Sequence, residues 1–280
     1  MRDATRGRRT VTGLAPARTW FPEIEPRTAS RRSRWVEIAC VLLVSLGASA
    51  IYAVIQIADL ATRPEPIGEQ VVALNPQRDE RAWLDLAYQL TGHLLDLVPV
   101  VLVCWLLWRS RRPHLARLGI TFDRPARDLG WGAVLLLVVG IPGLAIFAAG
   151  RALGLTAALA PSPLDAQWFT VPILLVAALR AGVTEEVIVV GYLFERLRSL
   201  GWGRAQIIVG AALLRATYHL YQGVGGFLSN LLLGLLFGWL YTRYGRLLPL
   251  VIAHVLIDVV AFVGYPVAAG AWPALFGLDG

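Results

Sequence analysis

The sequence contains no lysine, one methionine and two cysteines, and charged residues make up only 16% of it. A soluble globular domain usually carries about 25% charged residues. Cys40 and Cys104 both fall inside apolar runs, so a disulfide framework is not expected. The first 34 residues lack an apolar stretch, which argues against a cleaved secretory signal. The sequence also lacks an HExxH zinc helix, a GxSxG elbow and a paired-aspartate signature.

Long apolar runs dominate what is present. Hydrophobic residues make up 56% of the chain, and the mean hydropathy is +0.60. The runs are about 17–25 residues long, enough for helices to cross the roughly 30 Å hydrocarbon core of a bilayer. The sequence therefore predicts an all-α, polytopic transmembrane helical bundle in contact with lipid. The net charge of +7 does not indicate nucleic-acid binding, because the arginines lie between the apolar runs.

We expect about seven spans. They are Trp35–Leu60, Trp83–Trp108, Leu129–Ala149, Trp168–Leu197, Arg204–Tyr221, Phe227–Arg243 and Leu247–Tyr265. A short re-entrant segment or eighth helix within Gly150–Gln167 stays open. The expected organisation is an Arg-rich flexible cytoplasmic tail (1–34), N-terminal transmembrane helices with a basic loop (35–167), a helical core (168–265) and a short C-terminal tail (266–280).

The arginines predict the orientation of these spans. The tail and alternate loops (1–34, 109–128, 195–204 and 243–246) hold 20 of the 26 arginines, and the opposite set of loops holds four. Cytoplasmic loops of membrane proteins carry an excess of basic residues. We therefore expect a multi-pass protein of the plasma membrane with a cytoplasmic N-terminus.

Ionisable residues gather in the last four spans. A charge at the centre of a bilayer costs roughly 2.5–3.5 kcal/mol on insertion scales. Several such groups in one bundle are tolerable only if they face each other or water, so we expect them to converge on one polar cavity. The residues are Arg180, Glu185, Glu186, Arg215, His219, His254 and Asp258.

Helical spacing supports this convergence. His254 and Asp258 are i,i+4 neighbours, whereas the adjacent Glu185 and Glu186 diverge by about 100° and cannot share one role. A carboxylate, a water molecule and two imidazoles on separate helices can hydrolyse a peptide bond. The competing interpretation is structural: buried ion pairs with Arg180 or Arg215, and histidines that only link helices. We interpret His93 and Asp96, in the second span, as local polar contacts without a catalytic role.

At these residues the sequence resembles the CAAX prenyl protease and bacteriocin-processing (CPBP) family of glutamic intramembrane peptidases, also called the ABI family. The resemblance covers about Trp168–Tyr265. The first family motif, Glu-Glu with an arginine four residues later, resembles Glu185–Val190. The second, Phe-x-x-x-His, resembles Arg215–His219, and the third, His-x-x-x-Asn/Asp, resembles His254–Asp258. Three motifs in order on apolar helices are specific.

The resemblance implies an intramembrane endopeptidase that acts on a membrane-associated peptide or protein. Glu185 would activate the water, with His219 helping to hold it, and Glu186 would support the site. His254 and Asp258 would lie near the developing oxyanion. No cofactor is expected, and a divalent metal bound by the same glutamates and histidines is the open alternative.

Two positions depart from the family pattern. Val190 replaces the motif arginine, and Arg215 replaces the motif phenylalanine. We hypothesise that the changes compensate, because Arg215 can supply Glu186 with the cation that position 190 would otherwise provide. The alternative function is a non-catalytic membrane scaffold, a bacteriocin-immunity-type protein or a transporter that retains the fold.

Overall fold

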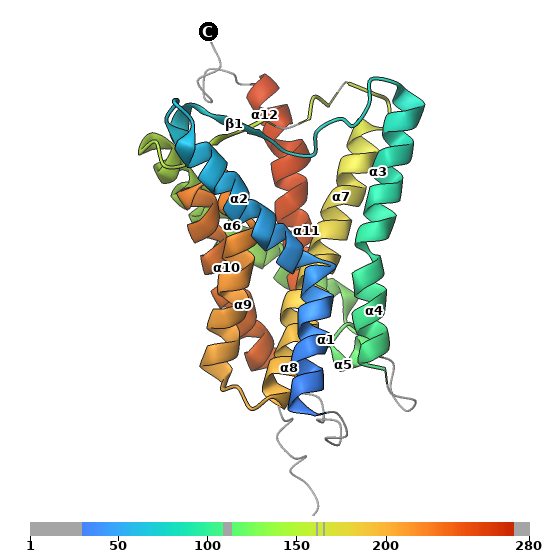
Figure 1. Cartoon of the computed structure of the whole chain (residues 1–280). Coiled ribbons are helices and arrows are strands. Elements are labelled where there is room, and N and C mark those ends of the chain that lie inside the picture. The colour runs from blue at the N-terminus through green and yellow to red at the C-terminus, as the bar shows by residue number, and fades with distance from the viewer. Residues whose placement is uncertain (1–29, 109–113, 161, 165, 272–280) are drawn as a thin grey trace, which may run out of the picture.

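The computed structural model describes residues 30–108, 114–160, 162–164 and 166–271. The described chain is mostly helical (Figure 1). Its α-helices are α1 (Arg31–Leu43), α2 (Leu46–Thr62), α3 (Ala82–Asp96), α4 (Val98–Leu106), α5 (His114–Arg117), α6 (Pro125–Ala152), α7 (Thr170–Glu185), α8 (Leu193–Ser199), α9 (Arg204–Tyr218), α10 (Val224–Tyr244), α11 (Leu248–Val259) and α12 (Tyr265–Ala271). Shorter elements are the 3₁₀ turns η1 (Ile67–Glu69) and η3 (Leu220–Gln222), the π-helical segments η2 (Glu186–Tyr192) and η4 (Val260–Gly264), and the strands β1 (Val71–Ala73) and β2 (Ala158–Ala160).

One long helix forms the centre of the bundle. It runs through α7, η2 and α8 without a break in the helical backbone, and every residue from Thr184 to Leu197 is buried. The apolar side chains of η2 and α8 pack into a core shared with α1, α4, α9, α10 and α11. π-Helical turns inside α-helices are rare and occur often at functional sites. The two neighbouring glutamates therefore lie where the central helix changes from α to π geometry.

Within the described residues, four helices are long and apolar enough to cross a membrane: Ala82–Leu106, Pro125–Ala152, Val224–Tyr244 and Leu248–Ala268. The bent pair α1–α2, with a 59° bend, makes a fifth if it counts as one span. These five correspond to five of the seven predicted spans. The fourth and fifth predicted spans are present as the central helix and α9, but neither is among the candidate spans. α9 has only 15 residues, and the central helix carries Arg180 and both glutamates close together.

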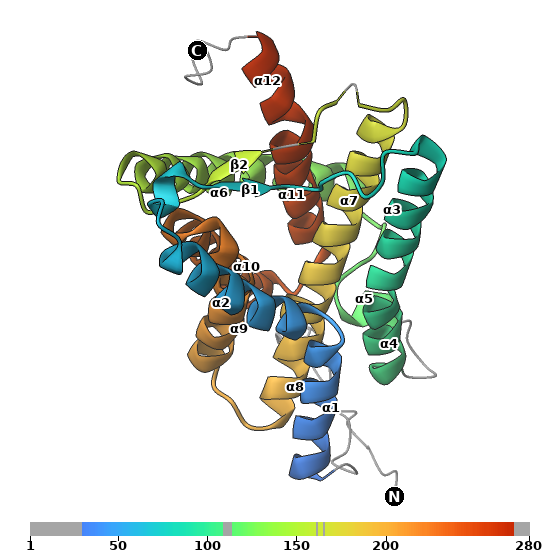
Figure 2. The same ribbon diagram turned by 45° about the horizontal axis from the view of Figure 1, so that its top comes forward.

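A small parallel sheet at one end of the bundle departs from the all-α prediction. β1 pairs with β2 from Val71↔Ala158 to Ala73↔Ala160. Figure 2 shows this pair crossing the end of the bundle over α6, at the opposite end from α8 and the start of α1. The described residues between α6 and α7 include β2 and no helix, so the eighth helix left open within Gly150–Gln167 is not found in that part of the segment.

The ends of the chain also differ from the predicted boundaries. Residues 1–29, most of the predicted tail, lie outside the described part of the chain. α1 begins at Arg31, because the Ser30 hydroxyl caps the helix by accepting from the Ser33 N–H at 3.1 Å. Arg34, assigned to the tail, is buried and donates to Ser199 Oγ at 3.2 Å. α12 extends into the predicted C-terminal tail.

Glycine allows the helices that carry the polar residues to approach closely. A Cβ atom on Gly182 of α7 would lie 2.7 Å from Val255 Cγ2 and 3.1 Å from Val255 N of α11. A Cβ atom on Gly234 of α10 would lie 2.8 Å from Ala212 Cα of α9. Small residues at helix contacts are a common device for close packing in membranes. Here they hold α7, α9, α10 and α11 near enough for their polar side chains to meet.

Candidate active site

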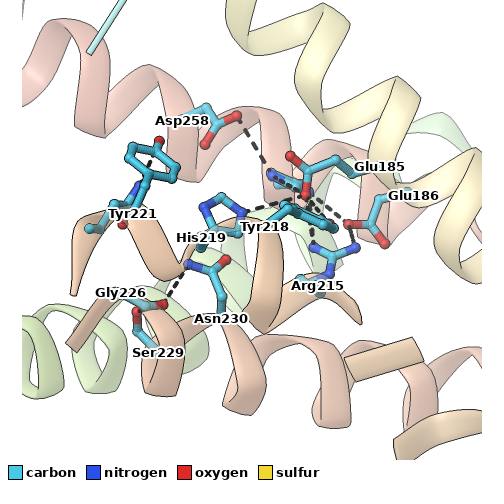
Figure 3. A network of polar contacts seen from close by, with 12 residues as sticks. Glu185, Glu186, Arg215, Tyr218, His219, Tyr221, Gly226, Ser229, Asn230 and Asp258 are labelled. Atoms are coloured by element: carbon cyan, nitrogen blue, oxygen red, sulfur yellow. Dashed lines mark hydrogen bonds and ion pairs between the residues drawn. The ribbon is translucent and has the colours of Figure 1, made fainter. Parts of the chain in front are cut away.

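Six of the seven polar residues expected to converge in the last four predicted spans meet inside the bundle, whereas the seventh, Arg180, lies apart from them beside Asp96 of α3. Figure 3 shows side chains from the central helix, α9 and α11 pointing toward one another. Glu185 Oε2 lies 3.8 Å from His219 Nε2 and 3.9 Å from His254 Nε2. His254 Nε2 lies 3.7 Å from Asp258 Oδ2. The structure therefore brings all six predicted site residues into one cluster, including Arg215 and Glu186.

Glu186 and Arg215 form the buried base of the cluster. Neither side chain has any solvent exposure, and Arg215 Nη2 donates to Glu186 Oε1 at 2.6 Å. The guanidinium also lies 5.9 Å from the ring centre of Phe237, a distance at which cation–π attraction operates. Because a buried carboxylate needs a counter-charge, Arg215 makes the burial of Glu186 tolerable. The contact between Arg215 and Glu186 is the one that the compensation hypothesis requires.

Val190 occupies an apolar position rather than part of this ion pair. Its side chain is 2% exposed and belongs to the core around η2 and α8. The cation beside Glu186 comes from α9, on a different helix from the one that carries the motif arginine in the family pattern. A positive charge is thus present beside Glu186 although the arginine of the family motif is absent.

His254 connects the base to the rest of the cluster. Its Nδ1 lies 2.7 Å from Glu186 Oε1 and 3.4 Å from Arg215 Nη1. An arginine can only donate, whereas a carboxylate can only accept, and the shorter contact is to the carboxylate. Nδ1 therefore carries the proton and donates to Glu186. This fixes the ring so that Nε2 faces Glu185 and Asp258.

Glu185 has a different environment from its neighbour. Tyr218 donates its hydroxyl to Glu185 Oε2 at 2.6 Å, and Arg215 Nη1 lies 3.8 Å from the same oxygen. In the described chain, the polar contacts of Glu185 all end on Oε2. Oε1 is left to accept from a water molecule. The roughly 100° between adjacent helical positions thus separates the two glutamates as expected.

Exposure increases across the cluster. The side chains of Glu186 and Arg215 are fully buried, His254 is 5% exposed, and Glu185 is 11% exposed. His219 and Asp258 reach 18% and 17%. Neither ring nitrogen of His219 has a hydrogen-bond partner in the described chain. The side of the cluster that carries Glu185, His219 and Asp258 is thus the more exposed one, although both ring nitrogens of His219 are themselves buried.

The cluster does not form a recognisable metal centre. Among the described residues, no group of three or more His, Cys, Asp or Glu side chains is placed to bind a metal ion. Tyr218 already occupies Glu185 Oε2, and His254 Nδ1 is occupied by Glu186. No step of the mechanism below passes through a metal.

Sequence reasoning did not assign a role to two residues near the cluster. Tyr218 is the hydrogen-bond donor to Glu185, and its position next to His219 in the second motif was the available signal. Asn230 of α10 lies near His219 in Figure 3 and donates to Gly226 O at 3.0 Å. For Asn230, the available signal was a polar amide side chain within a mainly apolar stretch of α10.

The profile of a protein family described as Rce1-like, type II CAAX prenyl endopeptidase, matches residues 167–260. This part of the chain belongs to the CPBP family. The matched segment contains the central helix, α9, α10 and all of α11, and with them every residue of the cluster. No curated protein and no solved structure matches the chain. The family match and the apolar helices together indicate a membrane protein related to CAAX-protease-like peptidases.

Proposed function

We propose that the protein is an intramembrane endopeptidase that hydrolyses a peptide bond of a membrane-associated peptide or protein. The observation that supports this most directly is the position of Glu185 Oε2, which faces imidazole nitrogens from two other helices at 3.8 and 3.9 Å. These distances are too long for direct hydrogen bonds and suit groups that act on a shared water or substrate.

In this mechanism Glu185 is the general base. It removes a proton from a water molecule that His219 helps to hold, while the water oxygen forms a bond to the carbonyl carbon. His254 and Asp258 lie beside the oxygen that becomes negatively charged: His254, protonated on both ring nitrogens, donates to that oxygen from Nε2, and Asp258 orients the ring. The C–N bond then breaks, and the proton on Glu185 passes to the leaving nitrogen. Glu186 and Arg215 stay paired and hold His254 through its Nδ1 proton.

The proposal includes the membrane arrangement predicted from the arginines. The bundle crosses the plasma membrane with about seven spans and a cytoplasmic N-terminus. The end with β1 and β2 then faces away from the cytoplasm. Protease accessibility of an N-terminal tag in right-side-out and inverted vesicles tests this orientation. A tag that is cleaved only in right-side-out vesicles would refute it.

Activity of the purified protein against a library of membrane-anchored peptides tests the chemistry. Glu185→Gln and His219→Ala are the informative variants, and Glu69→Gln, an exposed glutamate on η1, is the matched control. General base catalysis contributes typically about 10²–10⁴-fold, so we expect Glu185→Gln to lose at least ~100-fold in kcat. Glu69→Gln should cleave as well as wild type. Cleavage by wild type that persists in both site variants would refute the mechanism, and no cleavage by any form would favour a non-catalytic protein.

A further inference from the structure

A polar pocket of about 490 Å³ lies between α3, α7 and the segment that precedes α3. Ligand pockets in proteins typically measure about 300–1,000 Å³. None of the six site residues lines this pocket. Its lining residues are Asn75, Pro76, Arg78, Asp79, Tyr88, Gln89, Gly92, His93, Asp96 and Arg180.

α3 presents one polar face to this pocket. The lining residues from Tyr88 to Asp96 recur at helical spacing, so they share a face of the helix. Leu90, Leu94 and Leu95 of the same helix are exposed on other faces, as lipid-facing side chains would be. Polar residues in a membrane helix normally face protein or water. His93 and Asp96, interpreted from the sequence as local contacts only, thus belong to a larger polar surface.

The pocket is held in shape by the chain around it. Asp85, which is 2% exposed, accepts from the Arg78 N–H at 2.7 Å and from Gln89 Nε2 at 2.8 Å. The Ser162 hydroxyl donates to the carbonyls of Leu74 and Asn75 from the other side. The segment above α3 is therefore fixed at both ends. Such a preformed pocket binds a ligand without a large ordering cost.

The lining offers donors and charges of both signs. Three nitrogens, Asn75 Nδ2, His93 Nε2 and Arg180 Nε, are buried within the wall of the pocket and have no hydrogen-bond partner in the described chain. Arg180 Nε lies 3.6 Å from Asp96 Oδ2, too far for a hydrogen bond. Arg78 adds a second cation, whereas Asp79 adds a carboxylate.

This mixture favours a peptide over a phosphate ligand. The hydrogen bonds from Arg81 hold the pKa of Asp79 at about 2, so the carboxylate is charged at neutral pH. A phosphate in the pocket would face the like charges of Asp79 and Asp96. A polypeptide presents backbone donors and acceptors in alternation, together with side chains of either charge. Its chemistry matches the lining.

The pocket lies close to the proposed catalytic carboxylate. Arg180 lines the pocket and precedes Glu185 by five residues on α7, about 7.5 Å along the helix axis and roughly 140° around it. Thr184 donates to Asp96 O at 3.5 Å, which links the two helices at the level between them. An extended peptide advances about 3.3 Å per residue, so the axial part of this separation alone takes two or three residues.

We propose that the pocket between α3 and α7 binds a polar part of the substrate, at least two residues from the peptide bond that is cleaved. This inference rests on the proposed peptidase function. It assigns Arg78, His93, Asp96 and Arg180 to substrate binding, and it predicts that good substrates carry a polar flank beside the segment that enters the site.

Gly92 provides a direct test. It lines the pocket, and a Cβ atom added there would meet nothing within 4 Å. Gly92→Phe therefore adds a bulky side chain to the wall of the pocket, and its Cβ atom displaces no neighbour. Gly130→Phe is the matched control, because a Cβ atom at Gly130 of α6 also meets nothing within 4 Å. Two membrane-anchored peptides are compared, one with the polar flank and one truncated two residues after the cleaved bond.

We expect Gly92→Phe to lower kcat/KM for the flanked peptide at least ~10-fold, mainly through KM, as expected when uniform binding is lost. The truncated peptide should be cleaved equally by wild type and both glycine variants. Equal cleavage of the flanked peptide by wild type and Gly92→Phe would overturn the inference. An equal loss for both peptides would also overturn it, because the damage would then be general.

A binding measurement separates this inference from the proposed function. The flanked peptide is labelled with a fluorophore and titrated with the Glu185→Gln protein, with and without Gly92→Phe. We expect Gly92→Phe to weaken binding at least ~10-fold. If wild type cleaves no peptide but the flanked peptide still binds through the pocket, the catalytic proposal fails alone. Binding that is unaffected by Gly92→Phe would refute the pocket alone.

Discussion

Replacing Arg215 by phenylalanine, the residue of the family motif, would leave Glu186 without its cation. Both side chains are fully buried, and their contact is 2.6 Å. Removing one partner of a buried ion pair typically costs about 3–5 kcal/mol. A unit-charge interaction at 4 Å is worth about 4 kcal/mol at an effective dielectric constant of about 20, which agrees in size with that range. Since native proteins are stable by only about 5–15 kcal/mol, Arg215→Phe should remove a large part of the free energy of unfolding.

The double variant Val190→Arg/Arg215→Phe exchanges the positions of the cation and the apolar side chain. Val190→Arg alone should also destabilise, because it adds a second cation and extra volume to a packed core. If the exchange restores the charge beside Glu186, the double variant should be more stable than the sum of the single losses predicts. We expect a coupling free energy of at least ~2 kcal/mol, within the range seen for residues in contact.

Equilibrium unfolding in mixed detergent micelles measures these free energies, and peptide cleavage by the same samples measures activity. Arg124→Phe is the matched control, because this arginine is exposed and its ion pair with Asp123 should contribute little. Additive losses in the double variant, with no return of activity, would refute the compensation hypothesis. A negligible loss in Arg215→Phe would refute the role of Arg215 as the counter-charge.

Two further predictions concern the packing of α7 and the loop before α6. Gly182→Leu should lower the free energy of unfolding by about 1–3 kcal/mol, because the leucine side chain would collide with Val255. Gly130→Leu is the control, because a Cβ atom at Gly130 meets no neighbour within 4 Å. Equal losses of unfolding free energy in the two variants, measured in micelles, would contradict the packing argument. The hydroxyl of Thr121 and the guanidinium of Arg246 lower the pKa of Asp123 to about 2. Because this pKa is below the unfolded value of about 3.9, the stabilisation by Asp123 is present above pH 4 and is lost as the pH falls toward 2. The stability difference between wild type and Asp123→Asn should therefore shrink from pH 5 to pH 2, and a constant difference would contradict the assignment.

Periodicity and composition predicted the helices of the site well. The i,i+4 spacing of His254 and Asp258 and the divergence of Glu185 and Glu186 follow from helix geometry alone. The break between α1 and α2 was not predicted. It lies at Ser45, whose hydroxyl donates to the Val41 carbonyl, and serine bonded in this way often bends a helix. β1 and β2 were missed because their pairing joins segments that are distant in the sequence.

The sequence by itself determined that the chain is helical and membrane-embedded, because long apolar runs leave few other structures. It also determined which residues are costly to bury and therefore have to meet. The contact between Arg215 and Glu186 was also anticipated, from the two departures from the family motifs. Only the tertiary structure decided the other contacts: the Tyr218 hydroxyl on Glu185, His254 Nδ1 on Glu186, and a second polar pocket at Arg180. The physical reason is that helical spacing fixes only the face of its own helix on which a side chain lies. Which side chain it meets on a neighbouring helix depends on how closely the two helices pack, and glycines at their contacts set that distance.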